Sequence, residues 1–172
     1  NLVPDYCVTL DPHKTRPLRW FGDPKFSSHT HDDEYFNRQD LDVDFRNSDA
    51  AENERNIELV NLHAPEINLI ASGSLAPDLF SRLFEIKFKK IYGFNPLVDD
   101  PAKSNSLTRK LHELNGFTCV NTGGNVGTTA WAICQYLFES PKIGGIGFDY
   151  CYYEDTPYSE TQTYSELCAL NG

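Results

Sequence analysis

The chain of 172 residues has no methionine, no long apolar run, and only 15 lysine and arginine residues against 25 aspartate and glutamate residues. The net charge of −10 repels phosphate backbones and anionic lipid at long range, which argues against a nucleic-acid or membrane-surface role. No apolar stretch approaches the roughly 20 residues that a membrane span needs, so we expect no membrane insertion. Because methionine is absent even at the start of the chain, we expect an N-terminal segment to be missing.

Clustered cysteine pairs are also absent. Disulfide frameworks and zinc sites both require clustered spacing, whereas the five cysteines of this chain are odd in number and far apart. Cys7, Cys119 and Cys134 lie within apolar segments, where a free thiol behaves as a small hydrophobic side chain. We therefore predict that these three cysteines are unpaired and that the protein is reduced and cytoplasmic.

Aromatic side chains, by contrast, are plentiful. They make up 13% of the chain, a share that argues against disorder. A chain of 172 residues has the size of one ordinary domain and can bury roughly 68–70% of its unfolded surface without a metal or a disulfide. We therefore predict a single domain over residues 1–172.

Short apolar runs bounded by Pro, Gly, Asn or Asp recur along the chain, and their lack of alternation is typical of strands buried on both faces. The predicted strands are Asp5–Leu10, Ile67–Ala71, Lys90–Phe94, Phe117–Val120 and Ile143–Phe148. The predicted helices are Pro77–Phe88, Ser104–Asn115 with Ser104 as its cap, Thr128–Leu137, and one near Ala51–His63. This alternation predicts right-handed βαβ units in a Rossmann-like, doubly wound α/β fold with a mostly parallel sheet.

Two segments do not fit the alternation. Residues 12–49 follow the first predicted strand and combine acidic with aromatic side chains, which favours an ordered insertion or lid. Residues 150–172 form a tyrosine-rich tail without lysine or arginine. Its rings could stack on a base or a sugar, or simply pack at the edge of the domain.

A glycine-rich turn between a predicted strand and a predicted helix gives the sharpest functional signal. Ligands of open α/β sheets bind at the carboxyl ends of the strands, and such a turn exposes N–H groups that favour a phosphate. The turn matches neither of the two common glycine-rich nucleotide motifs, and a tight turn without a ligand remains the alternative. The candidate binding residues are Gly123, Gly124, Asn125, Val126, Gly127 and Thr128.

Acidic residues follow two of the predicted strands. Asp149 comes directly after Ile143–Phe148, where a carboxylate could act as a general base, hold a metal or bond a ribose hydroxyl. Asp11 and His13 follow the first strand and offer a carboxylate and an imidazole in the same position. A structural role as a turn or helix cap is the alternative. We predict that these three residues are catalytic.

The stretch from His29 to Glu34 concentrates histidines and carboxylates that could bind a divalent metal ion. Such runs are more often solvated loops, because the ligand set is unspecific. We therefore assign no metal ligand here.

Three blocks of the chain resemble the MptE-like family, which groups archaeal 6-hydroxymethylpterin diphosphokinases with bacterial motility-associated-factor glycosyltransferases. The blocks are Pro4–Pro12, Gly123–Thr128 and Ile146–Tyr150, and Asn95 after a strand also fits. The resemblance implies a Rossmann-like fold and a nucleotide-binding role for Asn95. The turn Gly-Gly-Asn-Val is closer to the glycosyltransferase branch, whose members transfer nonulosonic sugars from nucleotide-activated donors. Family members carry a Gly-Pro-Ser-Leu phosphate loop before the first block, and this chain begins after that place.

Three functions follow from these residues and the resemblance. The first is a glycosyltransferase that uses a nucleotide-activated sugar, with Asp149 or Asp11 assisting the acceptor. The second is a diphosphokinase that transfers diphosphate from ATP to a pterin-like alcohol, with Mg²⁺ held by such carboxylates. The third is a nucleotide-binding or interaction module without catalytic activity. We predict the first, with a nucleotide or nucleotide sugar as the ligand.

Overall fold

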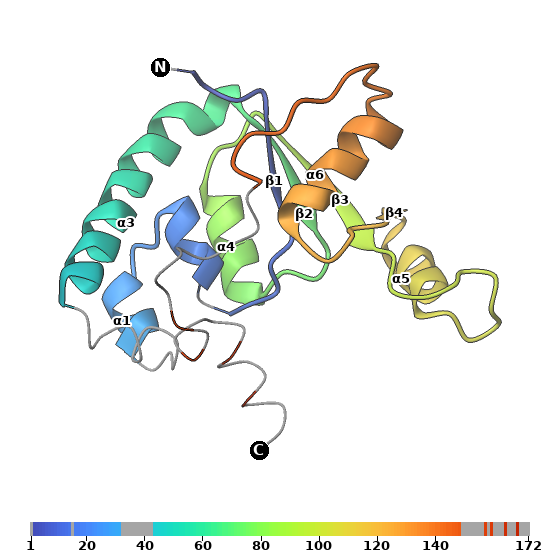
Figure 1. Cartoon of the computed structure of the whole chain (residues 1–172), viewed down its shortest axis with the longest axis horizontal. Coiled ribbons are helices and arrows are strands. Elements are labelled where there is room, and N and C mark those ends of the chain that lie inside the picture. Colours follow the sequence, from blue (N-terminus) through green and yellow to red (C-terminus); the bar gives the residue numbers. More distant parts are fainter. Residues whose placement is uncertain are drawn as a thin grey trace.

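The computed structural model describes residues 2–14, 16–31 and 43–148, together with positions 157, 159, 164 and 168. Figure 1 shows a parallel sheet with helices around it. Its four strands are β1 (Tyr6–Thr9), β2 (Asn68–Ser72), β3 (Lys90–Pro96) and β4 (Thr118–Val120), in the order β1-β2-β3-β4. All three pairings between neighbouring strands are parallel, so the predicted α/β class is confirmed.

The strands end at different levels along the sheet. Thr9, the last residue of β1, is level with Ala71 of β2 and Gly93 of β3. β3 continues to Pro96, which pairs with Val120 at the end of β4. The carboxyl edge of the sheet therefore rises from β1 toward β4.

The long helices are α3 (Val43–His63), α4 (Pro77–Glu85), α5 (Leu107–Asn115) and α6 (Val126–Ala132), and a π-helix η3 (Ile133–Leu137) continues α6. Pro77 begins α4 because its fixed φ suits the first helical turn, where no N–H bond is needed. Gly116 ends α5 with a left-handed φ of 71°, as the Asn-Gly pair predicts.

One face of the sheet packs against α4 and the helices near the N-terminus. Leu69 and Ala71 of β2 are buried there because alternate strand residues point to the same face. They contact a cluster formed by Leu18, Phe21, Ala64, Leu75, Leu79, Leu83 and Ile86. Ala64 belongs to the 3₁₀ turn η2 (Ala64–Glu66), which links α3 to β2.

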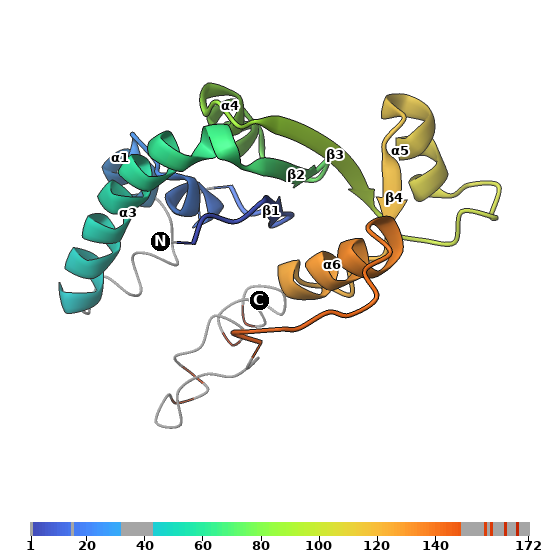
Figure 2. The same ribbon diagram turned by 90° about the horizontal axis from the view of Figure 1, so that it is seen from above.

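The opposite face packs against α6. Ile70, between the two residues just named, points to this face and joins Phe94 and Val120 of the next strands. Ala132 and Ile133 cover them from α6 and η3. Figure 2 shows α6 on the other side of the sheet from α4 and α5. Helices therefore cover both faces, as the sequence predicts, although the four strands follow the order of the chain.

Most of the described part of segment 12–49 is helical. The 3₁₀-helix η1 (Arg16–Phe21) buries Leu18 and Phe21 in the first core, and α1 (Phe26–His31) follows it. Residues 32–42 lie outside the described residues, and α3 begins at Val43 rather than near Ala51. The apolar periodicity misses this start because the added turns of α3 are mostly polar.

Two further details of the prediction are wrong. Ile143–Phe148 forms no strand and runs irregularly, because three of its six residues are glycines and Gly147 has a φ of 75°. The N-cap of α5 is Ser106 rather than Ser104, since the Ser106 side chain accepts the Arg109 N–H. The tyrosine-rich tail lies almost wholly outside the described residues.

Candidate functional site

The glycine-rich turn joins β4 to α6 at the carboxyl edge of the sheet, where the pattern predicts it. Gly123 and Gly124 have φ values of 60° and 90°, in the left-handed region that favours glycine. A Cβ on Gly123 would also lie 2.8 Å from the Thr128 Oγ1 atom. Gly123 is therefore required by both its backbone conformation and the space around it.

Side chains of the turn and of α6 hold this conformation. The Asn125 Oδ1 atom accepts the Thr128 N–H at 2.9 Å and so caps the helix. The Thr128 and Thr129 hydroxyls both donate to the Thr122 carbonyl, at 2.6 and 3.1 Å. Thr129 is fully buried. The turn is thus fixed before any ligand arrives.

The first turn of α6 presents positive potential to solvent. Its Val126 and Gly127 N–H groups have no helical acceptor, as is general at a helix start. The turn contains no acidic residue, and Gly123, Gly124 and Val126 are exposed. Backbone dipoles and free donors of this kind bind anions such as phosphate.

The start of α5 at the same edge differs because a carboxylate of the chain itself occupies it. Asp99 accepts the Leu107 N–H at 2.7 Å and the Thr108 N–H at 3.1 Å. The Ser106 hydroxyl donates to Asp99 at 2.7 Å. These bonds, led by the one from Leu107, hold the pKa of Asp99 well below its ordinary value.

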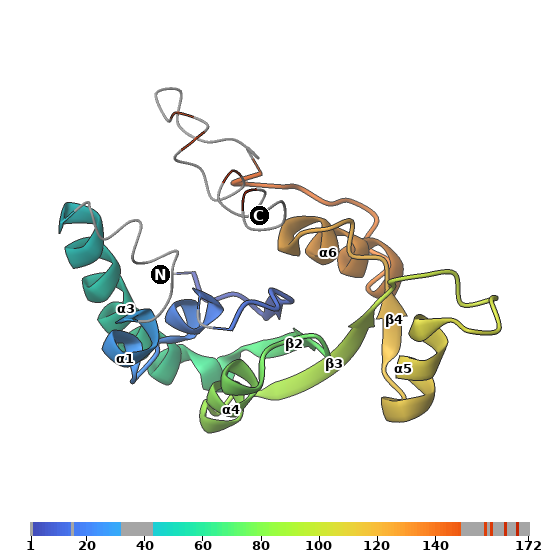
Figure 3. The same cartoon turned by 90° about the horizontal axis from the view of Figure 1, so that it is seen from below.

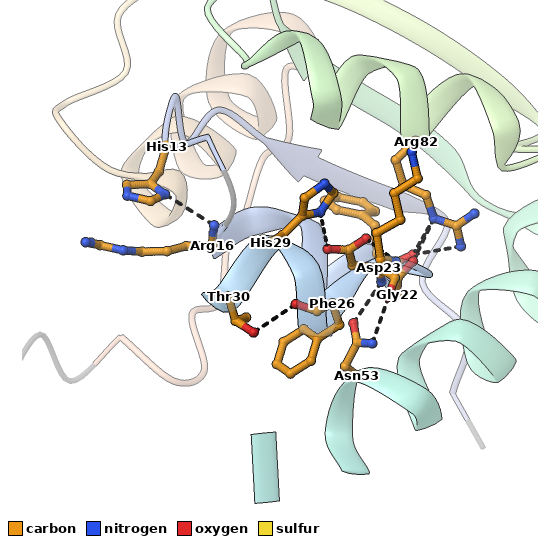
Figure 4. A network of polar contacts seen from close by, with 11 residues as sticks. His13, Arg16, Gly22, Asp23, Phe26, His29, Thr30, Asn53 and Arg82 are labelled. Carbon is orange, nitrogen blue, oxygen red and sulfur yellow. Dashed lines mark hydrogen bonds and ion pairs between the residues drawn. The ribbon is translucent and has the colours of Figure 1, made fainter. Parts of the chain in front are cut away.

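Asp11 and His13 lie just beyond the carboxyl end of β1. The Asp11 Oδ1 atom accepts the His13 N–H at 2.9 Å, and the His13 Nδ1 atom accepts the Arg16 N–H at 3.2 Å. Asp11 is exposed, so its carboxylate remains accessible on the same edge as the glycine turn. These bonds also fix the path of the chain from β1 into η1 (Figure 4).

Asn95 lies in β3 on the face that carries α5. Its amide exchanges two hydrogen bonds with the Asn115 amide, at 2.9 and 3.0 Å. Asn115 also accepts the Phe117 N–H, so the pair ties the end of α5 to the sheet. In this structure the amide of Asn95 is engaged and buried, whereas the glycine turn and Asp11 are exposed.

Asp149 lies outside the described residues, and its predicted catalytic role stays a prediction. The structure brings Gly123, Gly124, Asn125, Val126, Gly127 and Thr128 together in one turn. Asp11 follows a parallel strand at the same edge, and α6 contacts β1. The glycine turn and Asp11 thus lie on the same edge of the sheet.

A polar network around Asp23 is the constellation that the sequence patterns missed. The Asp23 carboxylate is buried and lies 2.6 Å from His29 Nδ1, while its Oδ1 atom accepts the Lys25 N–H (Figure 4). Asn53 of α3 accepts the Asp23 N–H and donates to the Asp23 carbonyl. Arg82 of α4 donates to the Phe21 and Gly22 carbonyls. The pair Asp23-Pro24, just before α1, is the sequence feature that could have pointed to this network.

Two cavities adjoin this network. One of about 270 Å³ lies between the Asp23–Lys25 turn and α4, with His29, Ser81 and Arg82 on its walls. The other, of about 480 Å³, lies between α1 and α3. Among the described residues, no three His, Cys, Asp or Glu side chains are grouped to hold a metal ion. Asp32, Asp33 and Glu34 of the candidate metal stretch lie outside these residues.

No family model, curated protein or solved structure matches the chain, so the function must be inferred from the geometry of the site.

Cys7, Cys119 and Cys134 have free thiols, as predicted, and burial raises the pKa of Cys7. Within the described residues, no helix is both long enough and apolar enough to cross a bilayer.

Proposed function

We propose that the protein is a nucleotide-dependent transferase that uses a nucleotide-activated sugar as its donor. The observation that carries this proposal is the glycine turn, which leads into a helix whose first turn contains no acidic residue. The position of the turn at the carboxyl edge of a parallel sheet supports it, because open α/β sheets bind their ligands there. The resemblance to the MptE-like family supports the choice of a glycosyl donor.

Each group has a role in this proposal. The Val126 and Gly127 N–H groups bind the donor phosphates, and the Thr128 hydroxyl holds the turn in place through its bond to the Thr122 carbonyl. Asp11, or Asp149 beyond the described residues, accepts a proton from the hydroxyl of the acceptor. His13 positions the chain next to Asp11. In a general-base role, either carboxylate contributes roughly 10²–10⁴-fold to the rate.

Thermal-shift measurements with a panel of nucleotide sugars, ATP with Mg²⁺, and inorganic phosphate test the proposal. A ligand at 100 times its Kd stabilises the native state by about 2.7 kcal/mol. For a chain of this length, we expect a nucleotide sugar to raise Tm by roughly 5–10 °C.

The other outcomes separate the alternatives. A shift with ATP and Mg²⁺ but not with nucleotide sugars would support the diphosphokinase. A shift with bare nucleotides, and no transfer of sugar to any acceptor, would support a binding module. Asp99→Asn serves as the matched control, because it alters the start of α5 and leaves the glycine turn intact. A shift that this variant loses would place the ligand at α5 and contradict the proposal.

A further inference from the structure

Only one edge of β1 is paired in the part of the chain that the structure describes. Within the described residues, β1 pairs with β2 on one side and with no strand on the other. The Asp5 carbonyl accepts the Asn68 N–H, and alternate residues of a strand direct their backbone groups to the same side. Tyr6 and Val8 therefore direct theirs to the open edge. Such an edge is a template for a further strand.

The handedness of the chain connections indicates where the next strand belongs. The connections from β1 to β4 place α4 and α5 on one face of the sheet, whereas α6 covers the other face. Crossovers between parallel strands are right-handed in about 98% of cases. A right-handed crossover through α6 must run opposite to the earlier ones, and so it leads past β2 to the open side of β1.

The chain after α6 reaches the correct end of that edge. The Phe138 ring, directly after η3, lies 4.7 Å from the ring of Tyr6 at the amino end of β1. Figure 3 shows the following segment running back along α6 toward the side of the sheet where β1 lies. Ile143 follows Phe138 by five residues, a span of at most about 18 Å. A strand parallel to β1 would have to begin there.

Ile143–Phe148 carries two exposed apolar side chains that an added strand would bury. Ile146 is 98% exposed and Phe148 is 40% exposed, so both leave apolar surface in water. The left-handed φ of Gly147 is one that glycine leaves for an extended conformation at little cost.

We propose that the open edge of β1 is a docking surface for Ile143–Phe148 of the same chain, which adds there as a fifth parallel strand. The irregular path of this segment in the structure is the undocked arrangement. Docking buries Ile146 and Phe148 and pairs the outward backbone groups of Tyr6 and Val8. The proposal requires no nucleotide and is independent of the proposed function.

Hydrogen–deuterium exchange of the peptide 143–148 tests the docking. Val8→Pro removes an N–H that faces the open edge and leaves the bonds between β1 and β2 in place. Val8→Ala removes the same packing but keeps the N–H. We expect the peptide to exchange at least about tenfold faster in Val8→Pro than in Val8→Ala, because pairing protects amides. Equal exchange in the two variants overturns the proposal.

A second measurement tests the docking even if Val8→Pro fails to fold. Ile146→Asp changes a residue that is exposed in the undocked arrangement and buried in the docked one. Leu2→Asp is the matched control at a fully exposed leucine. Docking predicts that Ile146→Asp lowers Tm by about 3 °C or more, a shift typical of losing apolar burial in a chain of this length, whereas Leu2→Asp leaves it unchanged. Equal Tm values for the two variants contradict docking.

Discussion

Helices α5 and α6 begin at the same edge of the same sheet, yet their first turns are closed differently. At α5 the Asp99 carboxylate accepts the first N–H groups at 2.7 and 3.1 Å. At α6 the neutral Asn125 amide accepts only the Thr128 N–H, and the residues before it are two exposed left-handed glycines. The start of α5 therefore binds a carboxylate of the chain itself, whereas the hydrogen bonds of the described residues place no carboxylate at the start of α6.

The difference shows what this edge does to negative charge. The N–H groups at the start of α5 donate to the Asp99 carboxylate and lower its pKa, as donors that stabilise an anion do. The same groups at α6 would stabilise an anion that comes from solution. A chain with a net charge of −10 repels anionic ligands over most of its surface. We therefore expect an anionic ligand to bind at the start of α6.

The largest expected effect comes from Gly123→Ala. The left-handed φ and the contact with Thr128 both oppose a Cβ, and we expect the free energy of unfolding to fall by about 2–3 kcal/mol. Nucleotide-sugar binding should be lost, because the turn can no longer keep its shape. Gly116→Ala is the control: its φ is 71° but no atom lies within 4 Å of the new Cβ. Urea unfolding that gives equal losses for both variants would contradict the steric part of this account.

The threonines behind the two helix starts give the next effect. Thr108→Val removes the acceptor of the Val98 and Asp99 N–H groups, and we expect a loss of about 2 kcal/mol because two donors lose their partner. Thr129→Val removes a donor from two carbonyls that keep other partners, so the loss should be about 1 kcal/mol. Chemical denaturation measures both. The reverse order would show that the turn before α6 depends on its side chains more than the structure indicates.

Asn125→Asp makes the start of α6 resemble that of α5. The carboxylate keeps the cap and favours the helix dipole, so the free energy of unfolding should rise by a few tenths of a kcal/mol. The same charge repels phosphate, and we expect the Kd of a nucleotide sugar to increase at least about tenfold. Asn125→Ser keeps a neutral cap and should bind like the natural chain. Isothermal titration that gives the same Kd for Asn125→Asp and Asn125→Ser would place the phosphates elsewhere.

Asp99→Asn gives the smallest effect, and one that depends on pH. A carboxyl whose pKa is lowered on folding stabilises the native state above its ordinary pKa, and this stabilisation is lost as the pH falls toward the lower value. We therefore expect the Tm difference between the natural chain and Asp99→Asn to be constant above about pH 5 and to shrink below about pH 4. Calorimetry from pH 3 to pH 7 measures it. A difference that grows as the pH falls would have the wrong sign.

The strands and the glycine turn could be predicted because each depends on nearby residues. Continuous apolar runs identified β1 to β4, and the Asn-Gly pair identified the end of α5. The position of Gly124 at the carboxyl edge followed from strand, turn and helix in succession. Local patterns of this kind carry their own physical cause, namely burial on both faces and a backbone that only glycine adopts readily.

The parts that the sequence did not predict depend on distant partners. Asp23 is positioned by Asn53, thirty residues away, and Arg82 reaches carbonyls about sixty residues away. No local pattern encodes such bonds. The start of α5 was missed for a similar reason, because Asp99 reaches across seven residues to Ser106 and makes that residue the cap. Ile143–Phe148 reads as a strand from its apolar residues, but its glycines leave it irregular here.

Because the carboxyl edge of the sheet is staggered, the ends of β1 and β4 lie at different heights along the strands. β4 ends level with Pro96, three residues beyond the level at which β1 ends. Three residues of parallel strand rise about 10 Å. A compact anion such as free phosphate is too small to contact both the end of β4 and the end of β1. An elongated molecule with phosphates at one end and hydroxyls at the other can bridge it, and we expect this edge to distinguish ligands by their reach as well as by their charge.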